Sequence, residues 1–229
     1  MALAVMLCAL GLAGCGAEAQ SARGAEPPDY LSVIATAQGD SIPIFDEPGG
    51  DPKLQLSNPT DVGADRVFLV RGGNGDGWLQ VLLPVRPNGS VGWIRTADVT
   101  LAKTTYRVHI SLSEHRFVLM HGKEDAVASG PIAVGKEHTP TPDGEYYIVS
   151  LLKTPKEESS YGPYAFGLSG FSGVLESFSG GPGRIGIHGT NKPELLGEDI
   201  SHGCIRMSND DITKLAKTLP LGAPVYVHA

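Results

Sequence analysis

The residues ISHGCIRM at positions 200–207, together with GIHGT at positions 186–190, decide the fold and the chemistry expected of this chain. A thiol nucleophile needs a partner that takes its proton, donors for the developing oxyanion and a backbone that exposes the sulfur. Cys204 supplies the thiol, and either His188 or His202 can take the proton. A base within reach should raise the thiolate fraction of Cys204.

Local backbone supplies the remaining requirements. The amides of Gly203 and Cys204 can point at an oxyanion, and Gly203 permits the tight geometry that exposes the sulfur. His188 ends an apolar strand at residues 185–187, which would hold its ring in a fixed place. His202 lies two positions before the thiol, so both histidines stay open as the base on this evidence.

The N-terminal residues suggest export. Residues 1–14 carry no charge, and their apolar run at 4–12 is too short to span a bilayer, which is typical of a signal peptide. The sequence LAGC at 12–15 resembles a lipobox, so we expect lipid on Cys15; cleavage at an ordinary Ala-rich site without lipid, or a start further upstream, is the alternative. Residues 15–29 then form a lipidated cysteine and flexible tether, and Cys204 is left as a free, reactive thiol.

Composition favours a mainly β protein in two units. With 30 Gly, 17 Pro and 19% charged residues among 229, turns and strands are expected rather than long helices. The net charge of −7 argues against a nucleic-acid partner. Short apolar runs separated by turn residues predict a small β-barrel at residues 30–103, whose paired Gly-Trp strands at 77–81 and 89–94 resemble a bacterial SH3-like domain.

The second unit, residues 104–229, opens with alternating residues at 106–112 and 116–120, which predict a hairpin, and closes with a strand at 224–228. Ser208 can cap one short helix that Pro220 ends. The sequence from 160 to 173 shows neither strand nor helix period and is interpreted as an irregular loop that could act as a lid. Its aromatic residues are either walls of a substrate groove or packing residues, namely Tyr161, Tyr164 and Phe171.

The pattern HGT, a short insertion and SHGCIRM resembles the signature of the L,D-transpeptidase catalytic domain, also called YkuD-like. The resemblance covers residues 106–228 and implies a β-sandwich-like domain with one helix after the nucleophile loop. It also implies that a cysteine attacks the peptidoglycan stem peptide after its third residue, releases D-alanine and passes the acyl group to an amine, which forms 3-3 cross-links. Carbapenems are covalent inhibitors of this family.

Position by position, the resemblance makes Cys204 the nucleophile and His188 the base, whose other ring nitrogen donates to the Gly189 carbonyl. His202 matches a supporting histidine. The remaining matches are oxyanion-hole amides at Gly203 and Cys204 and positions that brace the loop or hold the substrate carboxylate at Ser201 and Arg206. For Arg206 the loop is the preferred partner, although guanidinium recognition of a carboxylate is also chemically sensible.

Other functions remain open. The same thiol and base could pass the acyl group to water, which would make an L,D-carboxypeptidase. A zinc site at His188, His202 and Cys204 lacks a fourth ligand and a known spacing, so no cofactor is expected. A non-catalytic wall-binding lipoprotein is the third alternative. The expected partners are peptidoglycan stem peptides and, through the lipid, the membrane; we expect a monomer in the extracytoplasmic cell envelope.

Overall fold

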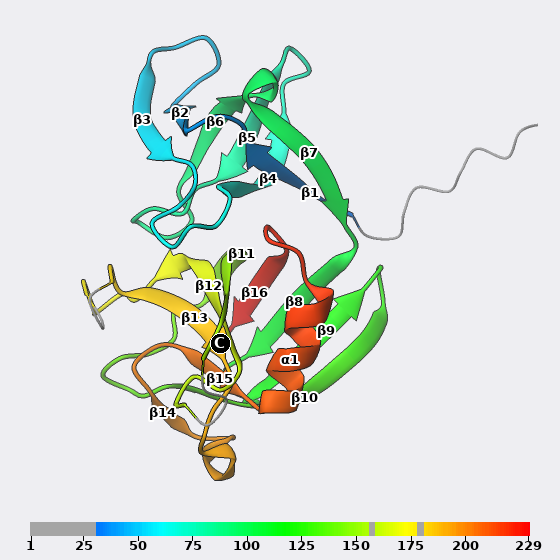
Figure 1. Cartoon of the computed structure of the whole chain (residues 1–229), viewed down its shortest axis with the longest axis vertical. Helices are drawn as coiled ribbons and strands as arrows, with labels where there is room; N and C mark the ends of the chain where they lie inside the picture. The colour runs from blue at the N-terminus through cyan, green and yellow to red at the C-terminus, as the bar shows by residue number, and fades with distance from the viewer. Residues whose placement is uncertain (1–30, 156–158, 178–180) are drawn as a thin grey trace, which may run out of the picture.

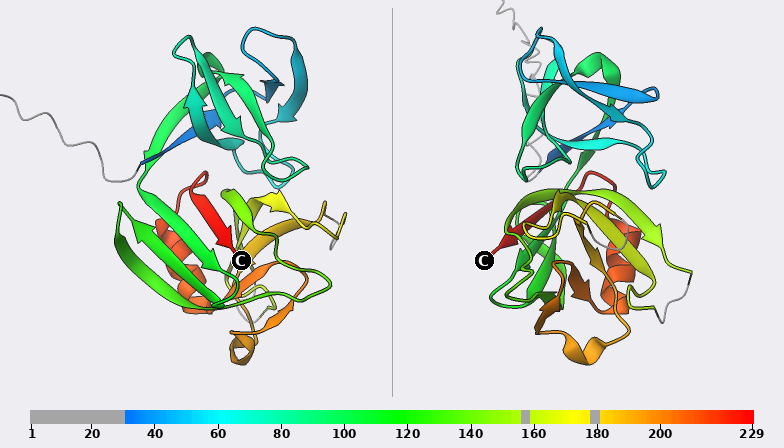
Figure 2. Two further views of the ribbon diagram at one scale, coloured as in Figure 1. Left: turned by 180° about the vertical axis from the view of Figure 1, so that it is seen from behind. Right: turned by 90° about the vertical axis from the view of Figure 1, so that its left-hand side faces the viewer.

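A computed structural model describes residues 31–155, 159–177 and 181–229, which are built mainly of β-strands. The strands form two sheets, one above the other in Figure 1 and in the two views of Figure 2. We call them the N-terminal sheet and the C-terminal sheet. The chain passes from one to the other between Thr104, the last residue of β7, and Tyr106, the first of β8.

The N-terminal sheet has seven strands in the order β3-β2-β6-β5-β4-β1-β7, and all its pairings are antiparallel. Alternate residues point inward and form a core that includes Ile42, Phe68 and Ile94, each fully buried. Its strands are β1 (Ser32–Ala37), β2 (Ser41–Phe45), β3 (Pro52–Ser57), β4 (Val67–Gly73), β5 (Trp78–Leu82), β6 (Val91–Arg95) and β7 (Val99–Thr104), with a 3-10 turn at Thr96–Asp98. Its SH3-like character stays a prediction.

The C-terminal sheet has nine strands in the order β14-β10-β15-β13-β12-β11-β16-β8-β9, with β10 also pairing with β9. Three pairings are parallel, β8 with β16, β13 with β15 and β10 with β14. The strands are β8 (Tyr106–Ser111), β9 (Arg116–His121), β10 (Asp125–Gly135), β11 (Gly144–Lys153), β12 (Tyr164–Phe171), β13 (Arg184–His188), β14 (Asp199–Ser201), β15 (Ile205–Met207) and β16 (Pro224–His228), with a 3-10 turn at Pro193–Leu195. The opening hairpin and the closing strand were predicted correctly.

The α-helix α1 (Asn209–Thr218) is the only one in the described part of the chain, as predicted. The Ser208 hydroxyl accepts a hydrogen bond from the Asp211 amide at 3.1 Å and so caps the first turn. Ile212 and Leu215 are fully buried, and the helix packs on β10, β12 and β13. The helix therefore closes the core of the C-terminal sheet directly after the predicted nucleophile loop (Figure 1).

The prediction of an irregular loop over residues 160–173 is wrong for most of this segment. Residues 164–171 form β12, which pairs with β11 on one side and β13 on the other and lies in the middle of the sheet. Gly167 and Gly170 hide the strand period because they leave gaps in the apolar alternation. These glycines are required by close approach: a Cβ at Gly170 would lie 2.2 Å from the Tyr146 ring, and one at Gly167 would lie 2.5 Å from the Ser150 hydroxyl.

The two sheets are joined by apolar and polar contacts. Leu69 and Leu82 of the N-terminal sheet form one buried cluster with Tyr147 and Val149 of β11. Arg71 of β4 also forms an ion pair with Glu145 of β11.

A further set of polar contacts comes from the turn before β6, which binds the segment that follows β12. The Arg86 guanidinium donates to the carbonyl oxygens of Ser172 at 2.7 Å and Leu175 at 2.9 Å, and it lies 4.9 Å from the Phe171 ring centre. The Asn88 amide accepts from the Phe171 N–H at 2.9 Å and donates to its carbonyl at 2.8 Å, as a neighbouring strand would. We call these contacts, with the buried cluster and the ion pair, the joint.

Several expectations fall on residues that the structure does not describe. The signal peptide at 1–14, the lipid on Cys15 and the tether at 15–29 all lie outside the described residues. In the ranges that are described, no helix has the length and apolar character needed to cross a membrane.

Candidate active site

Two short parallel strands bring the predicted catalytic residues together. In the pairing of β13 with β15, Ile187 lies beside Ile205 and His188 beside Arg206. One residue earlier, the same register places Cys204 beside Gly186, and the Gly186 backbone forms a hydrogen bond with the Cys204 thiol.

Side chains along β13 and β15 alternate between the buried core and the active-site face. Ile185 and Ile187 of β13, and Ile205 and Met207 of β15, are at most 1% exposed and fill the core. The side chains next to these four residues along each strand, which include those of His188 and Cys204, therefore face the other side of the sheet, since successive side chains alternate. His188 and Cys204 thus lie on one face as diagonal neighbours, with no side chain at the intervening Gly186.

The ring of His188 is fixed by its neighbour in the chain. His188 is 6% exposed, and its Nδ1 lies 2.7 Å from the Gly189 carbonyl oxygen. A carbonyl can only accept, so Nδ1 carries the proton and Nε2 keeps a lone pair. Burial lowers the pKa of His188 to about 4, opposed by the Gly189 hydrogen bond and assisted by the charge of Arg206. The imidazole is therefore neutral and able to accept a proton at pH 7.

The thiol of Cys204 is free and partly buried. Burial raises its pKa, and the hydrogen bond with the Gly186 backbone and the charge of Arg206 oppose that change. The expected increase in thiolate fraction is therefore wrong for the resting site, because desolvation outweighs both stabilising contacts. The resting pair is a neutral thiol beside a neutral imidazole, rather than a thiolate and an imidazolium.

The nucleophile loop, residues 201–204, is closed by the Ser201 hydroxyl. This hydroxyl accepts from the Gly203 N–H at 3.0 Å and donates to the Cys204 carbonyl at 2.5 Å. Gly203 has a φ of 112°, a conformation that residues with a side chain rarely adopt. Of the two amides expected in the oxyanion hole, that of Gly203 is thus already used within the loop, and Ser201 acts as a brace.

A second brace comes from the turn after β10. The buried Thr139 hydroxyl donates to the Ser201 carbonyl at 3.2 Å, and the buried Thr141 hydroxyl donates to the Gly203 carbonyl at 3.0 Å. Thr141 also accepts from the Gly135 N–H at 2.9 Å. The available signal was two threonines that are each followed by a proline, since proline has no N–H group to donate and a neighbouring hydroxyl can bond to the backbone instead.

Gly189 is held against the start of the helix. The Asn209 side chain accepts from the Thr190 N–H at 2.9 Å, and a Cβ at Gly189 would lie 2.3 Å from that same Asn209 oxygen. Gly162 approaches from the loop that precedes β12, and the same Cβ would lie 3.0 Å from its Cα. Asn209 is a site residue that sequence analysis missed, because its helix-start position has an ordinary structural explanation.

The three aromatic residues proposed for the groove separate in the structure. Tyr161 lines the cavity at the thiol, and its ring centre lies 4.6 Å from that of His188. Tyr164 packs against the core of the C-terminal sheet, and Phe171 is buried in the joint between Arg86 and Arg184. Only Tyr161 is therefore placed where it can touch a substrate.

His202 and Arg206 complete the lining of the cavity. His202 is exposed, whereas His188 is buried and oriented. The Arg206 Nε is buried and has no hydrogen-bond partner among the described residues. The preferred interpretation of Arg206 as a loop brace is not supported at this atom, because the loop is braced by hydroxyl groups instead.

The cavity itself has a volume of about 100 Å³ and is lined by both histidines, Cys204, Ser201, Arg206, Ser160 and Tyr161. Larger hollows of about 410 and 480 Å³ lie at the joint and on the N-terminal sheet, without a nucleophile. Within the described ranges, no three His, Cys, Asp or Glu side chains gather in a way that could hold a metal ion. The chemistry that this arrangement can perform is acyl transfer through the thiol.

Comparisons with known proteins agree with the motif. Residues 105–227 match the model of the L,D-transpeptidase catalytic domain. Over 122 residues the chain is 37% identical to a Bacillus licheniformis protein named as an L,D-transpeptidase, YkuD, covering 53% of this chain and 65% of that one. The Bacillus subtilis protein of the same name is 40% identical over 98 residues, covering 43% of this chain and 51% of that one. The chain thus spans between half and two thirds of the length of these relatives.

Among solved structures, an L,D-transpeptidase from Mycobacterium smegmatis is similar with a TM-score of 0.45 and 15% identity. The similarity covers 72% of this chain and 92% of that one.

Proposed function

Since this chain belongs, through residues 105–227, to the L,D-transpeptidase catalytic domain family, we propose that it is a cysteine-dependent peptidoglycan L,D-transpeptidase with Cys204 as nucleophile and His188 as base. The observation that carries the proposal is the placement of both side chains on one face of paired strands, with His188 Nδ1 bound to the Gly189 carbonyl. This leaves Nε2 as the acceptor for the thiol proton.

In the first half of the reaction, the Cys204 sulfur attacks the carbonyl carbon after the third residue of a stem tetrapeptide while His188 Nε2 takes the thiol proton. The oxyanion accepts a hydrogen bond from the Cys204 N–H, since the Gly203 N–H is bound to Ser201. When the intermediate collapses, the carbon–nitrogen bond breaks and His188 protonates the leaving amine of D-alanine. A thioester on Cys204 remains.

In the second half, an amine of another stem attacks the thioester carbonyl and gives a proton to His188. The carbon–sulfur bond breaks, the thiolate takes that proton back, and a 3-3 cross-link is formed. If water attacks instead, the product is a trimmed tripeptide and the enzyme is an L,D-carboxypeptidase. The two outcomes differ only in how well the acceptor amine is placed against water.

Neutral resting groups affect the timing of proton transfer. Because burial lowers the pKa of His188 and raises that of Cys204, the proton moves as the sulfur attacks rather than before. Arg206 stands beside both groups with a buried Nε that has no partner among the described residues. We assign it to the carboxylate of the stem, since a guanidinium binds carboxylates in a fixed bidentate geometry.

The test is intact-protein mass spectrometry with a carbapenem and, separately, with a stem tetrapeptide. Wild type should gain one adduct that Cys204→Ala does not. Product analysis with an amine acceptor present should then give cross-linked dimers, whereas tripeptide alone would favour the carboxypeptidase. Turnover by Cys204→Ala would contradict the proposal, and the absence of both adduct and product from wild type would favour the non-catalytic wall-binding role.

Arg206 has its own test. Arg206→Gln should raise the KM for the tetrapeptide more than it lowers kcat, and Arg206→Lys should restore part of the loss. An unchanged KM would indicate that Arg206 has a purely structural role.

The proposal places the enzyme as a monomer in the extracytoplasmic envelope, held to the membrane by lipid on Cys15. Incorporation of radiolabelled palmitate that is lost in Cys15→Ala would support that location.

A further inference from the structure

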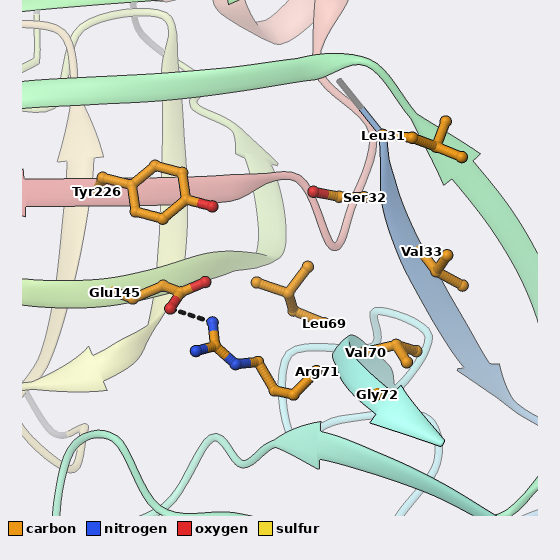
Figure 3. Close-up of a pocket in the computed structure, with 9 residues that line it drawn as sticks. All are labelled: Leu31, Ser32, Val33, Leu69, Val70, Arg71, Gly72, Glu145 and Tyr226. Carbon is orange, nitrogen blue, oxygen red and sulfur yellow. Dashed lines mark hydrogen bonds and ion pairs between the residues drawn. The ribbon is translucent and has the colours of Figure 1, made fainter. Parts of the chain in front are cut away.

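A groove runs along the joint on the side of the ion pair, between the two sheets (Figure 3). Its larger hollow measures about 410 Å³ and is lined by both sheets, with Ser32 and Arg71 from one and Glu145 and Tyr226 from the other. A second hollow of about 210 Å³ also includes Arg71 and Glu145 and continues towards Asn88. The ion pair thus lines both hollows, an arrangement that suits a linear chain rather than a compact ligand.

The lining of the groove is chemically mixed. Figure 3 shows the Tyr226 side chain extending from β16 and the Arg71–Glu145 ion pair below it, with Leu69 between them and the N-terminal sheet. Leu69 is buried, and the side chains of Arg71 and Glu145 are 40% and 24% exposed. The groove is therefore lined by a ring, a carboxylate, a guanidinium and an apolar residue, and one face of the Tyr226 ring stacks on His109 with the ring centres 5.1 Å apart.

The charges select the class of that occupant. Arg71 and Glu145 neutralise each other, and the whole chain carries a net charge of −7. A neutral pair offers no net charge to attract a charged ligand, and a polyanion would be repelled by the net charge of the chain. An uncharged polymer of hydroxyl and amide groups can instead bond to the outward lone pairs and N–H groups of an intact pair, because a carboxylate and a guanidinium have several such sites.

The groove is separate from the reacting bond. Along β12, Ala165 is paired with His188, and Phe171 is bound by Asn88 at the joint. A register shift between Gly167 and Phe171 sets these six residues of β12 against four residues of β13, which span about 13 Å. A four-residue stem reaches about 14 Å when fully extended. The groove would thus hold the part of the polymer to which the stem is attached, and not the bond that Cys204 attacks.

We propose that this groove binds the glycan strand of peptidoglycan, a linear uncharged polysaccharide with acetamido groups. Tyr226 packs against a sugar ring, the Arg71–Glu145 pair bonds to hydroxyl and amide groups, and the aliphatic floor takes an acetyl methyl group. The proposal rests on the proposed function, since it names the polymer whose stems the thiol would attack. It adds a site to which the N-terminal sheet contributes directly.

The test uses Cys204→Ala protein and a β-1,4-linked N-acetylglucosamine hexamer, which carries no stem peptide. Titration followed by amide NMR should show saturable binding, with shifts at Tyr226, Glu145 and Gly72. Tyr226→Leu should weaken binding about tenfold, as expected for loss of an aromatic contact, and Tyr226→Phe should weaken it less. Lys53→Met, which removes an exposed ion pair with Asp46 elsewhere on the N-terminal sheet, should change nothing.

Two results would overturn the inference: no saturable binding by folded protein at millimolar hexamer, or equal binding by wild type and Tyr226→Leu. Melting temperatures of the variants separate loss of folding from loss of contact, and Tyr226→Phe keeps the test valid if Tyr226→Leu fails to fold. The proposed function is tested apart from this, by acylation of wild type with a stem peptide that carries no glycan. Binding without acylation refutes the function, and acylation without binding refutes the groove.

Discussion

The nucleophile loop and the joint are both held by side chains that bond to backbone, but they differ in depth. In the loop, Ser201, Thr139 and Thr141 are buried hydroxyl groups that bond to neighbouring carbonyl and amide groups. At the joint, Arg86 and Asn88 bond to the β12–β13 hairpin from partly exposed positions. A bond lost in the loop leaves a buried group without a partner, whereas water can replace one lost at the joint.

The largest effect should come from the site that the loop serves. His188→Ala should slow single-turnover acylation by roughly a hundredfold to ten-thousandfold, as general-base removal does. His202→Ala should be slower than wild type but measurable, since its ring is exposed while that of His188 is buried and oriented. The reverse order, with His202→Ala inactive and His188→Ala only slowed, would exchange the two roles.

The next effect concerns the buried brace. Thr141→Val leaves the Gly203 carbonyl and the Gly135 amide without their partner, which should lower the free energy of unfolding by about 1–3 kcal/mol. Because the Gly203 carbonyl adjoins Cys204, acylation should slow as well. Denaturant unfolding and stopped-flow acylation measure the two effects. Thr218→Val, which removes the hydrogen bond of an exposed helix hydroxyl to the Lys214 carbonyl, serves as the matched control and should change acylation little.

A smaller loss is expected at the joint. Asn88→Ala removes both bonds to the Phe171 backbone and should lower the free energy of unfolding by about 1 kcal/mol, because water reaches part of the contact. Gln55→Ala, which removes an exposed hydrogen bond to Ser41, should cost less. If Asn88→Ala slowed acylation as much as Thr141→Val, the joint would belong to the catalytic scaffold and the contrast between the two regions would fail.

The smallest effect is a pH dependence. The pKa of His188 is about 4 in the folded protein and 6.5 in an exposed imidazole. The unfolded chain therefore takes up the proton first as the pH falls, so stability is full above pH 6.5 and is lost as the pH approaches 4. Between pH 7 and pH 6 the loss should be under about 1 kcal/mol. Denaturant unfolding of His188→Gln should lack this dependence, and that of His138→Gln should retain it.

Much of the site was predictable because it is local in sequence. Cys204, Ser201 and Arg206 lie in one motif, and His188 ends an apolar strand whose alternation is visible in the sequence. Three features of the structure could not be predicted from the sequence. The strand period of β12 is hidden by glycines that a neighbouring tyrosine ring and serine hydroxyl require. Whether the Gly203 N–H can bind an oxyanion depends on its hydrogen bond to Ser201, which a motif does not specify. The pKa of the Cys204 thiol depends on its burial.

The joint also limits how freely the two halves of this protein can be exchanged. Tyr147 and Val149 are covered by Leu69 and Leu82, and Ile34 lies against Gly222, where a Cβ would come within 2.4 Å of its side chain. A fragment that starts at residue 104 would present this apolar surface to water and would tend to self-associate. A different N-terminal half could replace the present one only if it carried residues that match this apolar surface. The two halves can therefore be exchanged only together with the residues of the joint.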